Sequence, residues 1–135
     1  YGRNLYQLDL KNWGTTQIIE ITKGGWLVTD MDINDSATLA VYKSDTEQQI
    51  AVRNLQTTEE KLYKSPENAK DAQIGSFKFS PDSTKVAFAA GYGPENERGE
   101  VYILDLNTGE SSLYKTTEAP PHITVWTDNN MPVYK

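Results

Sequence analysis

Apolar and polar residues alternate along most of the chain, and three segments share one form of this alternation. In each of them an alternating apolar run leads into a polar turn, which a second short apolar run follows. Alternation with a period of two places one set of side chains on one face of a sheet, so the pattern predicts a β-hairpin. The three segments are LYQLDLKNWGTTQII (5–19), IAVRNLQTTEEKLY (50–63) and VYILDLNTGESSLY (101–114). In the third turn, Gly109 is free to adopt a positive φ.

A second kind of hairpin lies between these segments. Its copies are MDINDSATLAVY (31–42), FKFSPDSTKVAF (77–88) and, more loosely, VWTDNNMPVY (125–134). Asp35, Asp82 and Asp128 are predicted to be corresponding turn residues, at spacings of 47 and 46 positions. Turn aspartates bond the backbone N–H groups that a sharp reversal exposes, so we expect a structural role for all three. Because the two kinds of hairpin alternate, the repeating unit is predicted to contain four antiparallel strands.

Four short strands that recur roughly every 40 to 50 residues are typical of a β-propeller, in which each unit forms one blade. With the strands lettered A to D outward from the axis, complete blades are expected at 27–64 and 74–115. Residues 3–22 would supply only strands C and D of a preceding blade, and 123–135 only strands A and B of a following one. The sequence therefore predicts a single all-β segment over 1–135, with about three blades' worth of strands cut out of phase.

The individual strands follow from the alternation and the turns. In the first complete blade they are expected near 27–33, 38–43, 49–55 and 60–64. In the second they are expected near 74–79, 85–90, 100–106 and 111–115. No segment shows a sustained helical period, and the connection at 65–73 is predicted to be a short turn or a single helical turn with Ser65 as its N-cap.

The stretch FKFSPDSTKVAFAA, followed by GEVYILDLNTGESSLYKTT, resembles the TolB-type, WD-repeat-like β-propeller repeat. In that family an aromatic residue with Ser-Pro-Asp-Gly opens a blade, and an apolar-Tyr-apolar-Asp-apolar run with Asp-Thr-Gly closes it. The match is close over 77–114 and loose elsewhere, and Ser83 stands where the family usually has glycine. The resemblance implies a propeller that binds other proteins and that lies outside the cytoplasm, in the periplasm, on the cell surface or secreted.

Three blades are fewer than the four to eight that propellers usually contain. An open array would leave an apolar face and unpaired strand edges at each end. Either the chain is a piece of a longer propeller, or two copies join head to tail so that 3–22 of one completes 123–135 of the other. The second arrangement would be a six-bladed ring with two-fold symmetry.

Composition narrows the possible partners. The net charge of −6, from 19 acidic and 13 basic residues, opposes the attraction to phosphate that supplies most nucleic-acid affinity. No apolar run approaches the roughly 20 residues that cross a bilayer, so membrane insertion is not expected. The chain has no cysteine, which excludes thiolate metal sites and cysteine nucleophiles.

Neither catalytic nor metal-binding residues are predicted, and no cofactor is expected. Ser80 and Ser83 do not lie in a nucleophile-elbow motif. The single histidine, His122, lies in the connection that follows the second complete blade. Asp30, Asp32 and Asn34 occupy the first three positions of a calcium loop, but its glycine and its bidentate glutamate are missing. We therefore expect Asp30, Asp32 and Asn34 to be solvated turn residues rather than ligands of a metal ion.

The insertion GYGPENERGE (91–100) is the candidate for partner binding because of its position. The B–C loops and the D–A connections must emerge on one face of a propeller, so the insertion shares a face with 65–73 and 116–122. Longer loops on one face commonly present binding groups. The candidate contact residues are Tyr92, Glu95, Glu97 and Arg98.

The leading functional prediction is a non-catalytic β-propeller module for protein–protein interaction, with a partner that the sequence does not identify. The alternative is the substrate-gating propeller of a serine peptidase of the prolyl oligopeptidase or dipeptidyl-peptidase type. A sugar-active propeller such as a lyase would need clustered histidines and basic residues at the axis, and the chain has one histidine.

Overall fold

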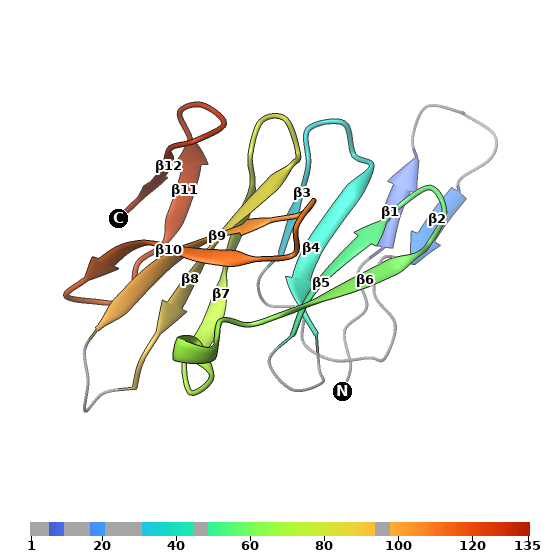
Figure 1. Cartoon of the computed structure of the whole chain (residues 1–135). Helices are drawn as coiled ribbons and strands as arrows, with labels where there is room; N and C mark the ends of the chain where they lie inside the picture. Colours follow the sequence, from blue (N-terminus) through green and yellow to red (C-terminus); the bar gives the residue numbers. More distant parts are fainter. Residues whose placement is uncertain (1–5, 10–16, 21–30, 45–48, 94–97) are drawn as a thin grey trace.

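The computed structural model describes residues 6–9, 17–20, 31–44, 49–93 and 98–135. These residues form an all-β fold in which two sheets of four antiparallel strands lie between two sheets of two strands (Figure 1). The all-β propeller fold predicted from the alternation is confirmed. Within the described residues, no helix has the length and apolar character that a bilayer crossing requires.

The strands follow the chain in simple up-and-down order within each sheet. The first two-stranded sheet contains β1 (Tyr6–Asp9) and β2 (Gln17–Glu20). The first four-stranded sheet contains β3 (Met31–Ile33), β4 (Leu39–Lys43), β5 (Gln49–Asn54) and β6 (Glu60–Lys64). The second contains β7 (Gln73–Phe79), β8 (Lys85–Gly91), β9 (Gly99–Asp105) and β10 (Ser111–Thr117). The last sheet contains β11 (Ile123–Trp126) and β12 (Pro132–Tyr134).

The first strands of successive sheets, β3, β7 and β11, lie next to one another and are the innermost strands. The turns that follow them emerge at the top of Figure 1, whereas the connection after β6 emerges at the bottom. That connection contains one short 3-10 helix, η1 (Glu67–Ala69), in agreement with the predicted single turn. Pro66 rather than Ser65 occupies its N-cap position, so the predicted cap is wrong by one residue.

Successive side chains of β8 point to opposite faces of the sheet and so contribute to two separate hydrophobic cores. Val86 and Phe88 point toward the first four-stranded sheet, whereas Ala87 and Ala89 point toward β11 and β12. In the first core the rings of Phe88 and Tyr102 stack with centroids 5.4 Å apart. The large side chains of one face and the small ones of the other explain how a single strand packs between two neighbouring sheets.

The turn after β3 and the turn after β7 have the same hydrogen bonds. In both, the first turn residue donates its N–H to the carbonyl five positions later, and these first residues are Asn34 and Ser80. Ser36 therefore corresponds to Asp82, and the predicted alignment of Asp35 with Asp82 is wrong by one position. The sequence allowed the error because several neighbouring polar residues fit a turn equally well, whereas the backbone hydrogen bonds fix the register.

The four predicted turn residues differ in what their side chains do. Asp82 Oδ1 accepts hydrogen bonds from Ser80 Oγ at 2.8 Å and from Thr84 N at 3.0 Å. Asp128 Oδ1 accepts one from the backbone N–H of Asn130 at 2.7 Å. The exposed Asp35 side chain makes no hydrogen bond with the described residues, so its predicted turn-stabilising role is wrong. Gly109 has a φ of 76°, in the left-handed region.

Candidate functional site

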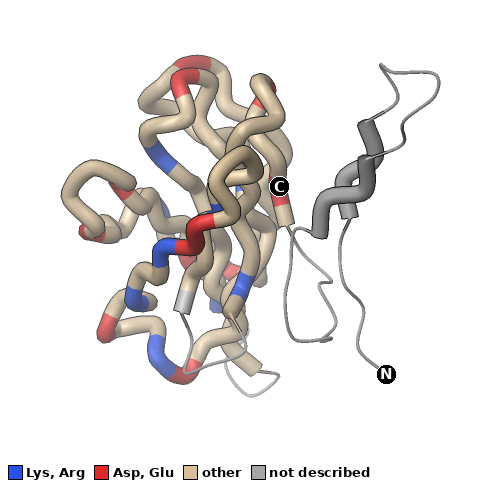
Figure 2. The backbone as a smooth tube through the Cα atoms, turned by 90° about the vertical axis from the view of Figure 1, so that its right-hand side faces the viewer, with Lys and Arg blue, Asp and Glu red and all other residues tan. Residues whose placement is uncertain are grey.

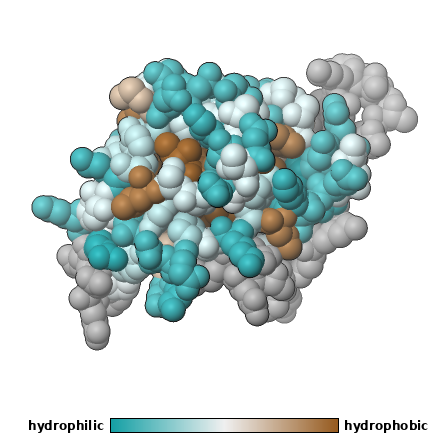
Figure 3. Space-filling model, viewed as in Figure 1, coloured by the Kyte–Doolittle hydropathy of each residue, from teal (hydrophilic) through white to brown (hydrophobic). Residues whose placement is uncertain are grey.

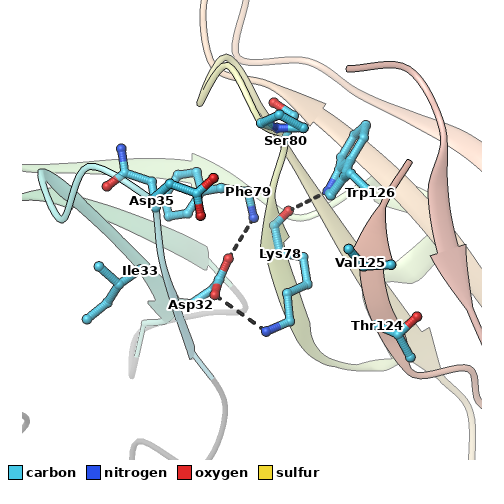
Figure 4. Close-up of a pocket in the computed structure, with 11 residues that line it drawn as sticks. Asp32, Ile33, Asp35, Lys78, Phe79, Ser80, Thr124, Val125 and Trp126 are labelled. Atoms are coloured by element: carbon cyan, nitrogen blue, oxygen red, sulfur yellow. Dashed lines mark hydrogen bonds and ion pairs between the residues drawn. The ribbon is translucent and has the colours of Figure 1, made fainter. Parts of the chain in front are cut away.

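The innermost strands of three sheets line a pocket of about 270 Å³ at the axis (Figure 4). Asp32 and Ile33 come from β3, Lys78 and Phe79 from β7, and the β11 residues are Thr124, Val125 and Trp126. The three strands β3, β7 and β11 belong to three different sheets, and β7 lies next to both β3 and β11. Its walls therefore belong to three neighbouring blades.

The polar groups of this axial pocket hold the blades together. Asp32 Oδ2 accepts a hydrogen bond from the backbone N–H of Phe79 at 2.8 Å, and its Oδ1 forms an ion pair with Lys78 at 3.5 Å. On the other side of β7, Trp126 Nε1 donates to the carbonyl of Lys78 at 3.0 Å. The sequence placed Asp32 in a possible cation loop, but both of its oxygens contact the next strand.

Asn34, another candidate for a cation site, has a similar structural role. Asn34 Oδ1 accepts hydrogen bonds from the backbone N–H groups of Thr38 and Leu39, both at 2.9 Å. Its Nδ2 donates to Ser83 Oγ of the following blade at 3.0 Å. Asp30 lies outside the described residues. Among the residues that the structure does describe, no three His, Cys, Asp or Glu side chains are grouped as metal ligands would be.

A buried carboxylate organises the candidate partner-binding loop. Glu100, at the start of β9, accepts hydrogen bonds from the hydroxyls of Tyr92 at 2.8 Å and Tyr102 at 2.7 Å. Arg98 forms an ion pair with Glu100 at 3.5 Å and places its guanidinium 4.6 Å from the centroid of the Tyr92 ring. Two of the four candidate contact residues, Tyr92 and Arg98, therefore lie against each other, whereas Glu95 and Glu97 lie outside the described residues.

Burial and hydrogen bonding to Glu100 raise the pKa values of two tyrosines. The pKa of Tyr102 is raised chiefly because its hydroxyl is removed from water, and secondly because the Glu100 carboxylate accepts its proton in a hydrogen bond. The pKa of the more exposed Tyr92 is raised for the same two reasons, in the same order. Both phenols therefore remain neutral donors to the carboxylate at neutral pH.

A second concave site lies directly beside this loop. It has a volume of about 440 Å³ and includes Ile74, Tyr92, Pro120, Pro121 and His122 in its lining. Its wall at 119–121 packs tightly on β9, because a Cβ atom at Gly99 would lie only 2.6 Å from the carbonyl oxygen of Ala119. The rim is open at Gly93, where a Cβ atom would meet no heavy atom within 4 Å.

The lining of this pocket includes a serine and a histidine in contact with each other. Ser76 Oγ lies 3.0 Å from His122 Nδ1 and accepts a hydrogen bond from the backbone N–H of Ile123 at 2.7 Å. Ser76 has a φ of 55°, which is unusual for a residue other than glycine. The contact ties β7 to β11, and no described carboxylate is hydrogen-bonded to His122 as a third member of a catalytic set.

Neither Glu100 nor Ser76 was predicted from the sequence as a site residue. Glu100 shares its alternation phase with Tyr102 and Leu104, which is the buried phase of β9, so its position carried a signal of burial. The sequence around Ser76 gave no such signal, because the contact of Ser76 with His122 joins residues 46 positions apart and depends on how two blades pack.

No family model matches the chain, and no curated protein matches it. Solved structures of the same fold do. Oligogalacturonate lyase from Vibrio parahaemolyticus is 19% identical with a TM-score of 0.69, over 95% of this chain and 37% of the lyase. An oligogalacturonate lyase in complex with manganese is 19% identical with a TM-score of 0.65, over 91% of this chain and 37% of that one.

The tricorn protease is a third similar structure, 16% identical with a TM-score of 0.60, over 82% of this chain and 11% of the protease. The chain thus spans little more than a third of the lyases and about a ninth of the protease. At these identities the likeness shows the fold, β-propeller blades, and nothing of activity. The TolB-type resemblance stays a prediction.

Proposed function

We propose that the chain is a non-catalytic β-propeller segment that binds a protein partner on the face of the Tyr92 loop, outside the cytoplasm. The observation that carries this proposal is the 440 Å³ pocket beside Tyr92, whose lining includes the apolar Ile74, Pro120 and Pro121 and the exposed His122. An apolar lining with a few polar groups, in a volume between about 300 and 1,000 Å³, suits a partner's anchoring side chain.

The contacts of Glu100 with Tyr92, Tyr102 and Arg98 support this proposal because they fix the wall of the pocket. Tyr92 donates to Glu100 and also lies 3.0 Å from the carbonyl of Asn68 in the neighbouring connection, so its ring is fixed from two sides. A preformed wall lowers the ordering cost of binding. Arg98 keeps about half of its side chain exposed and can contact the partner at the rim.

The test is a pair of matched variants on opposite faces. Gly93→Glu adds a side chain at the open rim of the pocket without an internal clash, and Asn107→Glu adds the same side chain on the opposite face, in an exposed turn. A partner captured by the immobilised wild-type chain would be identified by mass spectrometry, purified and titrated against both variants. We expect at least a tenfold loss of affinity for Gly93→Glu and none for Asn107→Glu. Equal affinities of the two variants would refute the location of the site.

A second candidate is the propeller portion of a serine peptidase, since the tricorn protease contains a segment with the fold of this chain. In that case the same face would meet a catalytic domain rather than a separate protein. The reading frame that encodes the chain decides between the two, because a peptidase would continue into a hydrolase domain with a G-x-S-x-G motif.

A further inference from the structure

The single histidine of the chain lines the 440 Å³ pocket beside Tyr92 (the Tyr92 pocket) and is held at one ring nitrogen. His122 Nδ1 lies 3.0 Å from Ser76 Oγ, and the same oxygen accepts a hydrogen bond from the N–H of Ile123 at 2.7 Å. The hydroxyl proton of Ser76 still needs an acceptor. His122 Nδ1 is the nearer one, because the carbonyl of Ile123 lies 3.5 Å away, at the limit of a hydrogen bond. The geometry therefore favours donation from Ser76 to Nδ1.

This contact sets the tautomer of the neutral imidazole. A ring nitrogen that accepts a hydrogen bond carries no proton, so the ring proton of His122 lies on Nε2. The histidine is exposed, and no described residue is hydrogen-bonded to its Nε2. Ser76 has a positive φ of 55° and lies at an irregularity of β7 between Gly75 and Lys78. A local distortion of β7 thus holds an N–H donor of the pocket in a defined orientation.

The rest of the lining is uncharged. None of the described residues that line the Tyr92 pocket is Asp, Glu, Lys or Arg. Arg98 and Glu100, which both contact Tyr92, form an ion pair with each other. A charged ligand would lose its hydration in this pocket without an opposite charge in the lining to replace it. The charged side chains of the segments around His122 do not line the pocket either: Lys78 on β7, Lys85 on β8, Glu118 in the connection and Lys135 after β12.

We propose that the Tyr92 pocket binds an uncharged apolar segment of the partner, an aliphatic side chain next to a backbone carbonyl that accepts a hydrogen bond from His122 Nε2. The aliphatic side chain would contact Ile74, Pro120 and Pro121 of the lining. An apolar lining with a few placed polar groups that fix the orientation of the ligand is usual for such sites. This inference rests on the proposed function, because it states the chemistry of the partner at the same face.

Binding of an uncharged segment would depend on pH in one direction. The histidine side chain ordinarily changes its charge between about pH 5 and pH 8. Protonated His122 would still donate from Nε2, but the complex would then bury a positive charge among apolar groups, with no carboxylate in the described lining. The neutral form therefore binds the uncharged segment more tightly, and the affinity falls as the pH falls. A carboxylate ligand would show the opposite dependence, because the protonated ring attracts it.

Nitrogen NMR of the imidazole tests the tautomer in the unmodified chain, because one histidine gives one set of ring signals. At about pH 8, where the ring is neutral, we expect the proton on Nε2 and none on Nδ1. A ring proton on Nδ1 would overturn the proposal, because Nε2 would then be an acceptor and would require a donor from the partner.

Two small probes test the class of ligand. N-acetyl-leucine methylamide is uncharged, and N-acetyl-leucine is the same molecule with a carboxylate in place of the second amide. Saturable shifts of the Tyr92 and Ile123 amide resonances measure binding. We expect the methylamide to bind more tightly than the carboxylate at about pH 8, and its affinity to be at least about threefold lower at about pH 5. The matched control is His122→Gln, which keeps an N–H donor and cannot be protonated, so its affinity for the methylamide should be the same at both pH values.

Tighter binding of the carboxylate probe would overturn the proposal, and so would no saturable binding of the methylamide. Equal pH dependence in the wild type and His122→Gln would also overturn it, because the dependence would then come from another group. The proposed function fails separately, through equal affinities of Gly93→Glu and Asn107→Glu for a captured protein partner, since that comparison uses neither probe.

Discussion

The Asp82 carboxylate shows how one charged group can fix a turn on the protein surface. Its Oδ1 accepts hydrogen bonds from the backbone and the hydroxyl of Thr84 and from Ser80. These bonds, first of all the one from the Thr84 N–H, lower the pKa of Asp82 below its usual value of 3.8. A depressed pKa in the folded state contributes stability above the usual value, and this contribution is lost as the pH falls through the depressed one.

The Asp82→Asn variant isolates that charge, because the amide oxygen can still accept hydrogen bonds. We expect the variant to be less stable than the wild type at neutral pH and the difference to shrink as the pH falls below 3.8. Urea unfolding of both proteins across this range measures it. A difference that is constant with pH would show that the charge contributes nothing.

Glu100 and Tyr102 give the opposite pH dependence. The raised pKa of Tyr102 means that the folded protein favours the neutral phenol, so this stabilisation is complete below the ordinary tyrosine pKa and is lost as the pH rises through the raised one. In Glu100→Gln the pKa of Tyr102 should fall but stay above the ordinary value, because burial remains the larger cause. Ultraviolet titration measures the phenolate, with Tyr102→Phe in each background as the control. A value unchanged by Glu100→Gln would contradict the assignment.

At the scale of elements, the outer turns of the two complete blades are built alike with one difference. Asn54 and Asp105 each accept hydrogen bonds from the two backbone N–H groups that lie two and three positions later. The residue with positive φ is Thr58 in the first turn, at 64°, and Gly109 in the second, at 76°. A β-branched residue in this region is strained, and the left-handed conformation costs about 1 to 2 kcal/mol for residues with a Cβ.

Thr58→Gly is therefore expected to stabilise the chain by about 1 kcal/mol. The mirror variant Gly109→Ala should destabilise it by a similar amount, for reasons of backbone conformation alone. A Cβ atom there would lie 3.7 Å from the Tyr63 ring, which is an ordinary contact. Denaturant unfolding measures both. If both variants shifted stability in the same direction, the φ argument would be wrong.

These repeated turns also explain what the sequence could predict. Within the two complete blades, the described strand ends agree with the predicted ones to within about two residues, because alternation and turn chemistry are local signals, whereas the predicted start at 27 lies outside the described residues. Wherever several polar residues adjoin, as at Asn34, Asp35 and Ser36, local signals leave the register open by one position. The contacts between Asp32 and Phe79 and between Ser76 and His122 join residues almost fifty positions apart, and only the packing of blades brings them together.

At the scale of the whole molecule, charge is distributed rather than concentrated. Figure 2 shows acidic and basic residues interspersed along the backbone, and Figure 3 shows apolar side chains in small separate groups on the face it displays. The blades are held by their buried cores and by a few polar contacts at the axis, which include the ion pair between Asp32 and Lys78. Single substitutions can measure how much each of these axial contacts contributes to the stability of the chain.

The relative strengths of the two Asp32 contacts can be compared by removing both contacts in one variant and the ion pair alone in another. Asp32→Ala removes both contacts and leaves the N–H of the buried Phe79 without its acceptor, which should cost about 1 to 3 kcal/mol. Lys78→Ala removes only the partly exposed ion pair, which should cost less than about 1 kcal/mol. Denaturant unfolding at one fixed protein concentration compares them, since self-association would make apparent stability depend on concentration. Equal losses in the two variants would mean that the ion pair, and not the bond to the backbone, joins the first two blades at the axis.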